Sequence, residues 1–262
     1  MTEPIRSPRA LLLDFGGVIV SSEKPAGWQE RVAHDIRMMV GEPDALPEHA
    51  RVVADVRAGA VAASLWRNAM SRPMHPAELD PRTYVLDFLA ADWPGRARAA
   101  LEPHVAAICY AVSAAKEIRT LRDGIVELLE WARERRLPVA IVSNALSGQV
   151  HRDVLREAGL SSWFAAELYS DEEGIRKPNP DFLLRGAAAV GARIDDCWYV
   201  GDHLDRDVLC GVRAGVGANV LMPAPGGSTR PYTVPVEADI VVSSPRELWD
   251  LLKNENPPAK AA

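Results

Sequence analysis

Four short apolar runs, each bounded by turn-forming residues, constrain the fold more than any other feature of this sequence. They are ALLLDF at 10–15, PVAIVSN at 138–144, CWYVGD at 197–202 and ANVLM at 218–222. Runs of this length and branched-residue content are typical of buried parallel strands. Helical patterns separate the later runs, so strand and helix alternate. This alternation predicts an α/β fold with a doubly wound parallel sheet, and a weaker run, AAELYS at 165–170, makes it five-stranded.

A long helical insert follows the first strand. Between Gly17 and Arg122 the pattern is helix after helix with no good strand, divided by turn signals such as GEPDALPE. The chain of 262 residues also exceeds the usual single-domain length of about 100–150 residues. We therefore expect an α/β core domain made of residues 1–20 and 118–262, with an all-helical domain at residues 21–117.

Charge and composition exclude several classes of partner. The formal net charge is -6 and the arginines are scattered among acids, which argues against a nucleic-acid or anionic-membrane binder. The sequence has no apolar stretch near the roughly 18 residues that a membrane span needs. Its three cysteines are odd in number and not in metal-ligand spacing, which favours a reduced, cytoplasmic protein. Both a monomer and a homodimer are compatible with this composition.

Polar residues stand where the predicted strands end. Ligands of a doubly wound sheet bind beyond the carboxyl ends of its strands, and those ends carry Asp14, Ser143 with Asn144, and Asp202. Lys177 follows in the loop GIRKPNP. Each residue alone is more often a helix cap or turn former, but the combination at equivalent positions indicates a site.

These residue types suit the transfer of an anionic group. Asp14 precedes two flexible glycines, so it can approach an electrophile closely and act as a covalent nucleophile toward phosphorus or carbon. Ser143 offers a hydroxyl, and Asn144 is expected to cap the helix that follows, whose N–H groups suit an anion. Lys177 precedes a proline, and Asn179-Pro180 then predicts a helix start. A cation at Lys177 would neutralise both Asp14 and a phosphate.

The carboxylates also predict a metal site. Mg²⁺ is usually held by one or two carboxylates, substrate oxygen and water, and Asp14 and Asp202 supply such carboxylates. Asp207 is expected to support the site, either by binding metal-bound water or by orienting Lys177. Asp205 is expected to cap the helix DVLCGVRAG, and His203, beside Asp202, is a weaker candidate for the site.

The ordered motifs resemble the haloacid dehalogenase (HAD) superfamily of aspartate-nucleophile hydrolases. The family pattern D-x-D-G-[TV] corresponds to Asp14-Phe15-Gly16-Gly17-Val18, and the later motifs to Ser143-Asn144, Lys177-Pro178 and VGDHLDRDVLCGVRAG. The resemblance implies a Rossmann-like core with a helical cap inserted after the first motif. It further implies Mg²⁺ as cofactor, bound in part by the backbone carbonyl of Gly16. A small phosphorylated metabolite would lie against Gly17, Ser143, Asn144 and Lys177.

Gly16 replaces the second aspartate that protonates the leaving oxygen in family phosphatases. Positioned acid–base catalysis is typically worth about 10²–10⁴ in rate. The leading interpretation is a Mg²⁺-dependent phosphohydrolase that forms an aspartyl-phosphate on Asp14. A catalytically weak phosphate-ligand binding protein, a metal-free 2-haloacid dehalogenase and an unusual phosphotransferase stay open. Restoring the acid with Gly16→Asp requires that residue 16 does not have a positive φ.

Overall fold

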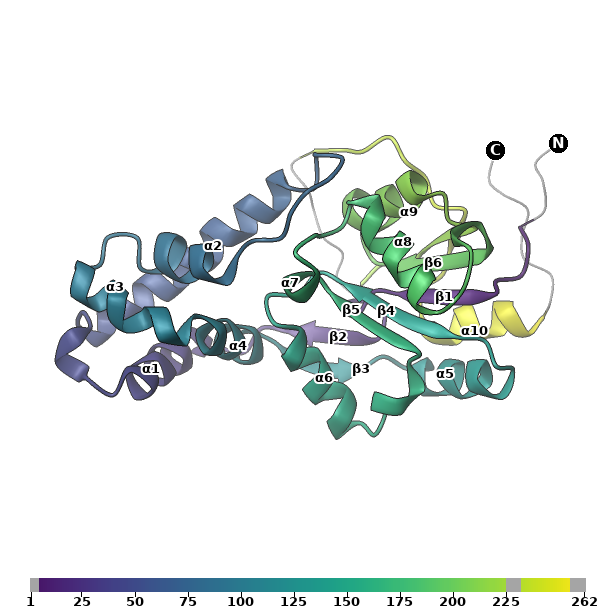
Figure 1. Cartoon of the computed structure of the whole chain (residues 1–262). Coiled ribbons are helices and arrows are strands. Elements are labelled where there is room, and N and C mark those ends of the chain that lie inside the picture. Colours follow the sequence, from purple (N-terminus) through teal and green to yellow (C-terminus); the bar gives the residue numbers. More distant parts are fainter. Residues whose placement is uncertain (1–4, 225–231, 255–262) are drawn as a thin grey trace.

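The computed structural model describes residues 5–224 and 232–254. A sheet covered by helices forms one unit, and a cluster of helices that projects from it forms a second (Figure 1). The sheet unit is built from both ends of the chain, and the projecting helices come from the segment between them. The first strand is therefore followed by a large excursion before the second sheet strand is added.

The main sheet has six parallel strands in the order β5-β4-β1-β6-β7-β8. Their bounds are β1 Ala10–Leu13, β4 Val139–Ser143, β5 Ala166–Tyr169, β6 Cys197–Gly201, β7 Ala218–Leu221 and β8 Ile240–Val241. The doubly wound α/β fold is confirmed, and all five predicted strands form. The sheet gains a sixth, β8, whose two residues are too short to stand out as an apolar run.

Helices cover both faces of the sheet, as Figure 1 shows for α8 and α9 on one side and α5 and α10 on the other. Leu11 and Leu13 of β1 enter one core cluster and Ala10 and Leu12 enter another, because successive strand side chains point to opposite faces. The sheet-unit helices are α5 Ile125–Glu134, α6 Gly148–Glu157, α7 Ser170–Glu173, α8 Pro180–Ala189, α9 Leu209–Ala214 and α10 Pro245–Lys253. Burial on both faces explains why the central strands are apolar throughout.

The projecting helices have their own core. They are α1 Trp28–Val40, α2 His49–Ala69, a π-helix at Thr83–Leu89, α3 Gly95–Leu101 and α4 Val105–Lys116. One buried cluster joins them, including Ile36, Val56 and Ile108. Gly59 lets α2 approach closely, because a Cβ there would lie 2.8 Å from the backbone of Leu89. We call residues 28–116 the helical unit.

Two further strands correct the expectation of no strand between Gly17 and Arg122. β2 Val20–Glu23 and β3 Ile118–Leu121 pair antiparallel and join the helical unit to the sheet unit. Their sequences, VSSE and IRTL, are short and partly polar because most of these side chains are only partly covered. A weak local pattern therefore conceals a pairing between segments almost a hundred residues apart. The predicted boundaries at residues 20/21 and 117/118 fall in this ribbon.

The helical unit also touches the sheet unit along residues 72–78, which we call the strap. Arg213 of α9 donates from Nη1 to the carbonyl oxygen of Pro73 at 2.6 Å. The amide of Glu78 donates to the carbonyl oxygen of Gly174 at 3.0 Å, and Ala77 forms a β-bridge with Ile175. The insert is thus attached at the β2–β3 ribbon and again at the strap.

Within residues 5–224 and 232–254, no helix combines the length and the apolar character needed to cross a bilayer. The three cysteines, Cys109, Cys197 and Cys210, are buried free thiols. They lie in the cores of the two units rather than in one cluster.

Candidate active site

All the sequence-predicted site residues line one cavity. Its volume is ≈ 770 Å³, within the usual range of about 300–1,000 Å³ for ligand pockets. The lining includes the residues singled out from the strand ends and loops, Asp14, Gly16, Gly17, Ser143, Asn144, Lys177, Asp202 and Asp207. Side chains from the helical unit complete the wall. The parallel sheet brings these distant segments together because their carboxyl ends meet at one edge.

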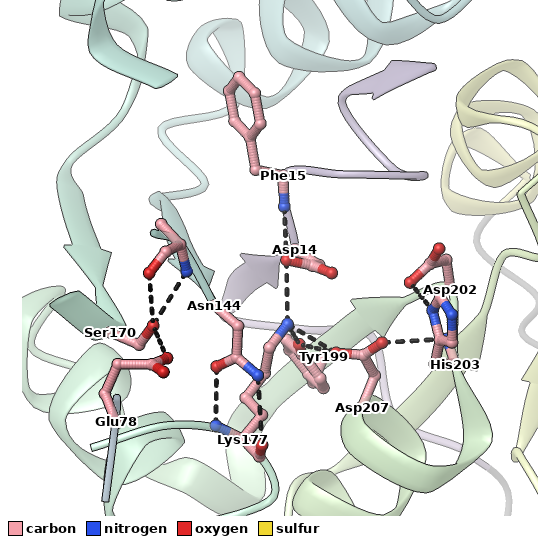
Figure 2. A network of polar contacts seen from close by, with 11 residues as sticks. Asp14, Phe15, Glu78, Asn144, Ser170, Lys177, Tyr199, Asp202, His203 and Asp207 are labelled. Carbon is pink, nitrogen blue, oxygen red and sulfur yellow. Dashed lines mark hydrogen bonds and ion pairs between the residues drawn. The ribbon is translucent and has the colours of Figure 1, made fainter. Parts of the chain in front are cut away.

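Lys177 lies at the centre of the charged groups (Figure 2). Its Nζ is 2.9 Å from Asp14 Oδ1 and 2.6 Å from Asp207 Oδ1. It also donates to the Tyr199 hydroxyl at 2.6 Å, and that hydroxyl donates to Asp207 Oδ1 at 2.7 Å. The Lys177 side chain is only 1% exposed. A buried ammonium is therefore held by two carboxylates and a phenol.

The two carboxylates beside Lys177 have different proton affinities. Burial raises the pKa of Asp14 to about 6, although Lys177 opposes the shift. Burial also acts to raise the pKa of Asp207, but Lys177 and His203 outweigh it and hold that pKa well below its usual range. The pKa of Lys177 is raised, because Asp14 and Asp207 together outweigh the effect of burial. Asp207 is thus the fixed anion, whereas Asp14 titrates near neutrality.

The two oxygens of Asp14 are not equivalent. Oδ1 accepts from the Phe15 amide at 2.8 Å and from Lys177. Oδ2 has no hydrogen-bond partner among the residues that the structure describes. The backbone is also anchored, because the Asp14 amide donates to the carbonyl oxygen of Val200 at 2.9 Å. One oxygen is held in place while the other keeps its lone pairs available.

Gly16 and Gly17 tolerate side chains very differently. A Cβ added at Gly16 would meet nothing within 4 Å, and its φ lies outside the left-handed region. Gly17 has a φ of 75°, and a Cβ there would collide with the carboxylate of Asp202. Position 17 therefore requires glycine, whereas position 16 has room and a backbone suitable for an aspartate.

The acidic groups have the chemistry of a divalent-cation site. Asp202 and Asp207 both act to raise the pKa of Asp14, so three carboxylates act on one another with the single ammonium of Lys177 among them. Both oxygens of Asp207 have donors, since Oδ2 accepts from the His203 amide at 3.0 Å. Asp14 and Asp202 are then the carboxylates left to bind a cation. Hard oxygen donors with excess negative charge fit Mg²⁺.

His203 lies at the site, although the sequence made it only a weak candidate. Its Nδ1 contacts Asp202 Oδ1, and its ring lines the cavity. Asp202, His203 and Asp207 offer ligand atoms within 4.8 Å of one another. Because Asp207 is occupied by Lys177 and imidazole is a poor ligand for a hard cation, this trio fits Mg²⁺ less well than a set that includes Asp14.

The expectation that Asp205 caps a helix is wrong. The helix begins earlier than expected, with a π-helical turn at Leu204–Val208 leading into α9. His203 occupies the N-cap position, so Asp205 lies inside the first turn. The Asp205 side chain is buried and accepts from the Tyr232 hydroxyl at 2.9 Å. Its carboxylate is therefore used in a tertiary contact rather than on the helix end.

Asn144 does not cap the following helix, which corrects a second expectation. α6 begins at Gly148 and its N-cap is Ser147. Asn144 instead brackets the backbone of Lys177, accepting from its amide at 2.8 Å and donating to its carbonyl oxygen at 3.2 Å. The expected start of α8 is confirmed, with Asn179 as N-cap accepting from the Asp181 amide. Asn144 thus fixes the segment that carries the ammonium.

Sequence reasoning missed several residues in the cavity wall or directly behind it. Tyr199 was part of an apolar strand, although a hydroxyl in a buried strand requires a partner and could have signalled its contact with Lys177. Four cations, Arg67, Lys116, Arg176 and Arg206, also line the cavity. They come from four separate segments, so no local spacing connects them.

Comparison with known proteins identifies relatives of the chain. Residues 8–215 match the family model of the haloacid dehalogenase-like hydrolases. A stretch of 129 residues is 26% identical to glyceraldehyde 3-phosphate phosphatase from Methanopyrus kandleri, covering 49% of this chain and 55% of that relative. A stretch of 136 residues is 30% identical to N-acylneuraminate-9-phosphatase from Rattus norvegicus, covering 52% and 53%. The chain spans about half the length of these curated relatives.

Solved structures share the fold over nearly the whole chain. A HAD phosphatase from Thermococcus onnurineus superimposes with a TM-score of 0.57 at 19% identity, covering 94% of this chain and 99% of that chain. The same overall fold therefore occurs in another protein of similar size.

Proposed function

Because the chain belongs to the haloacid dehalogenase-like hydrolase family, we propose that it is a Mg²⁺-dependent phosphohydrolase acting on a small phosphorylated metabolite. The observation that carries the proposal is the geometry of Asp14. Its Oδ1 is fixed by Lys177 and the Phe15 amide, and its Oδ2 is unpartnered among the described residues at the wall of the cavity. Such a carboxylate is suited to attack phosphorus.

The reaction takes place in two displacements. Asp14 Oδ2 forms a bond to phosphorus while the bond to the leaving oxygen breaks, which gives an aspartyl-phosphate. Water then attacks the same phosphorus, releases phosphate and restores the Asp14 carboxylate. Lys177 and the Ser143 hydroxyl contact the phosphoryl oxygens, and the main-chain N–H group of Asn144 donates to them. The Gly17 N–H is not available for this, because it donates to the carbonyl oxygen of Val20 at 2.8 Å.

Asp14, Asp202 and the carbonyl oxygen of Gly16 would hold the metal. When bound, Mg²⁺ screens the charge of the transferring phosphoryl group. Asp207 keeps Lys177 in place through its 2.6 Å contact and is a positioning residue. Deprotonation of Asp14 is required for attack, and a nearby divalent cation favours that charged form.

The helical unit acts as a cap in this proposal, with residues 21–117 as the cap domain. Arg67 of α2 and Lys116 of α4 line the cavity together with the strand-end residues. A cap that covers the site excludes bulk water and selects the substrate. The acidic chain with three buried free thiols suits the cytoplasm, where such metabolites occur.

A second candidate is a phosphate-ligand binding protein with little turnover. It is favoured by Gly16, because none of the predicted site residues supplies the acid that a leaving oxygen needs. The two proposals share the same cavity and differ only in whether the aspartyl-phosphate forms. A metal-free dehalogenase would use Asp14 toward carbon and would have no use for the carboxylate pair of Asp14 and Asp202.

A phosphatase screen with and without Mg²⁺ tests these alternatives. We expect EDTA to abolish phosphate release, Mg²⁺ to restore it, and Asp14→Asn to lower kcat by at least about 10⁴-fold. Asp123→Asn, an exposed carboxylate outside the cavity, is the matched control. Halide release from a haloacid in chelator would establish dehalogenation instead. A melting temperature raised by phosphorylated ligands without any hydrolysis would establish the binding protein.

A further inference from the structure

Besides Lys177, six cationic residues line the cavity. Lys24 is exposed and Arg119 is paired with Glu117 at 3.0 Å, which leaves four. Arg67 lies on α2, Lys116 ends α4, Arg176 precedes Lys177, and Arg206 lies in the π-helical turn before α9. We call these residues the cation cluster. The reaction proposed above needs only one buried ammonium and a divalent cation near the phosphorus. The cluster is therefore positive charge that the proposed displacement does not use.

Arg176 has donors that the described protein groups leave unused. Its side chain is 1% exposed, and its Nη1 contacts Glu78 Oε1 of the strap at 2.5 Å. Its Nε and Nη2 are buried and have no hydrogen-bond partner among the described residues. Leaving a buried charged donor without an acceptor is unfavourable, because the donor has lost its hydrogen bonds to water. An acceptor supplied from the cavity would remove that cost.

The other three members lack counter-ions within residues 5–224 and 232–254. No carboxylate lies within ion-pair distance of Arg67, Lys116 or Arg206 in this part of the chain. The nearby acids are already paired, because Glu78 contacts Arg176 and Glu117 contacts Arg119 at 3.0 Å. Glu23 also lines the cavity but is exposed beside Lys24. The cluster therefore has a net positive charge.

The cations are close enough to repel one another. Burial and, after it, the nearby charge of Arg67 lower the pKa of Lys116 to about 8. Burial also lowers the pKa of Arg67, to which Arg206 contributes. The pKa of Arg176 falls to about 10, first through burial and then through Arg67 and Arg206, although Glu78 opposes them. Four like charges from different elements are thus collected in one place.

We infer that the cation cluster binds a second anionic group of the substrate. The substrate class is then a phosphate ester that carries a carboxylate or a second phosphate in the same small molecule. Arginine forks recognise both groups through paired N–H···O bonds. This inference rests on the proposed function, because it assumes that the first phosphate lies against Asp14 and Lys177. A cavity of ≈ 770 Å³ has room for a small metabolite whose two anionic groups lie against the two sets of charges.

Matched substrates test the inference directly. One pair is 3-phosphoglycerate and glycerol 3-phosphate, which differ by a carboxylate in place of a hydroxymethyl group. The other pair is propane-1,3-diol bisphosphate and its monophosphate. We expect kcat/KM to favour the member with the second anionic group in at least one pair by about 10- to 100-fold, the usual effect of a hydrogen-bonded charge. The preferred pair distinguishes a carboxylate from a second phosphate.

Arg67→Gln assigns the selectivity to the cluster. It should lower the ratio of kcat/KM between the preferred substrate with two anionic groups and its matched phosphate monoester by about 10-fold or more. Arg57→Gln, on the same helix but exposed and outside the cavity, should leave that ratio unchanged. Because Arg176 also holds the strap, Lys116→Gln serves as the second variant and should shift the ratio in the same direction.

The outcomes separate the inference from the function on which it rests. If both members of each pair are hydrolysed with equal kcat/KM, or Arg67→Gln leaves the ratio unchanged, the second-anion site is wrong and the phosphohydrolase stands. If the wild-type protein with Mg²⁺ hydrolyses no phosphate ester, the proposed function fails. The cluster is then tested by whether 3-phosphoglycerate raises the melting temperature more than glycerol 3-phosphate, and equal shifts would overturn it.

Discussion

The two sets of charged groups in the cavity differ in how completely their polar atoms are bonded within the protein. Around Lys177, each partner of the ammonium is also fixed by another group, through Tyr199 and the amides of Phe15 and His203. In the cation cluster, Arg176 has one carboxylate partner and two unused donors. The first set, which we call the Lys177 network, is hydrogen-bonded within the described protein except at Asp14 Oδ2. The second set has an excess of donors.

This difference distinguishes interactions that the folded protein makes by itself from interactions that a bound ligand would complete. A satisfied network keeps its geometry before any substrate arrives, which is what a nucleophile requires. An unsatisfied set of donors is costly in the free protein and gains most when an anion binds. The sheet unit therefore supplies preorganised chemistry, and the helical unit supplies half of the cation cluster, Arg67 and Lys116.

The largest effect should come from adding an acid beside Asp14. Gly16→Asp places a carboxylic acid where a Cβ meets nothing within 4 Å and φ is not left-handed. We expect it to raise kcat for alkyl phosphates by about 10²- to 10⁴-fold, because the leaving oxygen gains a proton donor. The measurement is a series of aryl phosphates of graded leaving-group acidity, with cleavage of the first bond limiting the rate.

In the wild-type protein the logarithm of the rate should fall steeply as the leaving group becomes more basic. In Gly16→Asp that dependence should flatten, whereas Gly16→Asn, which has a similar size and no acid, should leave it steep. A folded Gly16→Asp protein with an unchanged steep slope would contradict the role given to this position.

Removing the central cation of the Lys177 network should lower the free energy of unfolding. Lys177→Met leaves the buried carboxylates of Asp14 and Asp207 without their common cation. Removal of one partner from a buried ion pair typically lowers the free energy of unfolding by about 3–5 kcal/mol. Urea denaturation at pH 7.5 in EDTA measures it. Lys253→Met, which removes an exposed ion pair with Asp250, should cost less than about 1 kcal/mol.

Removing a charge from the cation cluster should have the opposite effect on the free energy of unfolding. Arg67→Met removes one of several mutually repelling charges, so the free energy of unfolding should stay the same or rise. A loss of stability as large as that of Lys177→Met would show that the cluster stabilises the fold as the Lys177 network does. It would then remove the distinction between the two sets.

The smallest effect concerns the pH dependence of stability. The pKa of Asp14 is raised from 3.8 to about 6 in the folded protein, so the folded state holds its proton more tightly than the unfolded state. Stability is then lost as pH rises from about 4 to 6, by at most about 3 kcal/mol. Asp14→Asn cannot titrate and should lack this loss. Unfolding of both proteins in EDTA across this range measures it, and parallel curves would contradict the raised pKa.

The sequence predicted the parts of this molecule that have a local pattern. Apolar runs predicted the main strands, and polar residues at their ends pointed to Asp14, Ser143 and Asp202. The loop GIRKPNP pointed to Lys177. It failed where structure depends on distant partners. β2 and β3 are short and half polar, and each forms a strand only because the other pairs with it.

The same reason explains the errors at the site. Asn144 has the residue type of a helix cap, but a backbone 33 residues away uses its amide instead. The members of the cation cluster come from four segments whose meeting depends on how the helical unit sits on the sheet unit. No spacing along the chain encodes that arrangement.

The strap changes the mechanics of access to the cavity. A helical unit joined only by the β2–β3 ribbon could rotate about that single connection. Here the strap is a second attachment, at which Arg213 contacts Pro73 and Arg176 contacts Glu78. Rotation about the ribbon would stretch these contacts, so wide opening must first release them. The two attachments together therefore favour small motions of the helical unit over a large rotation.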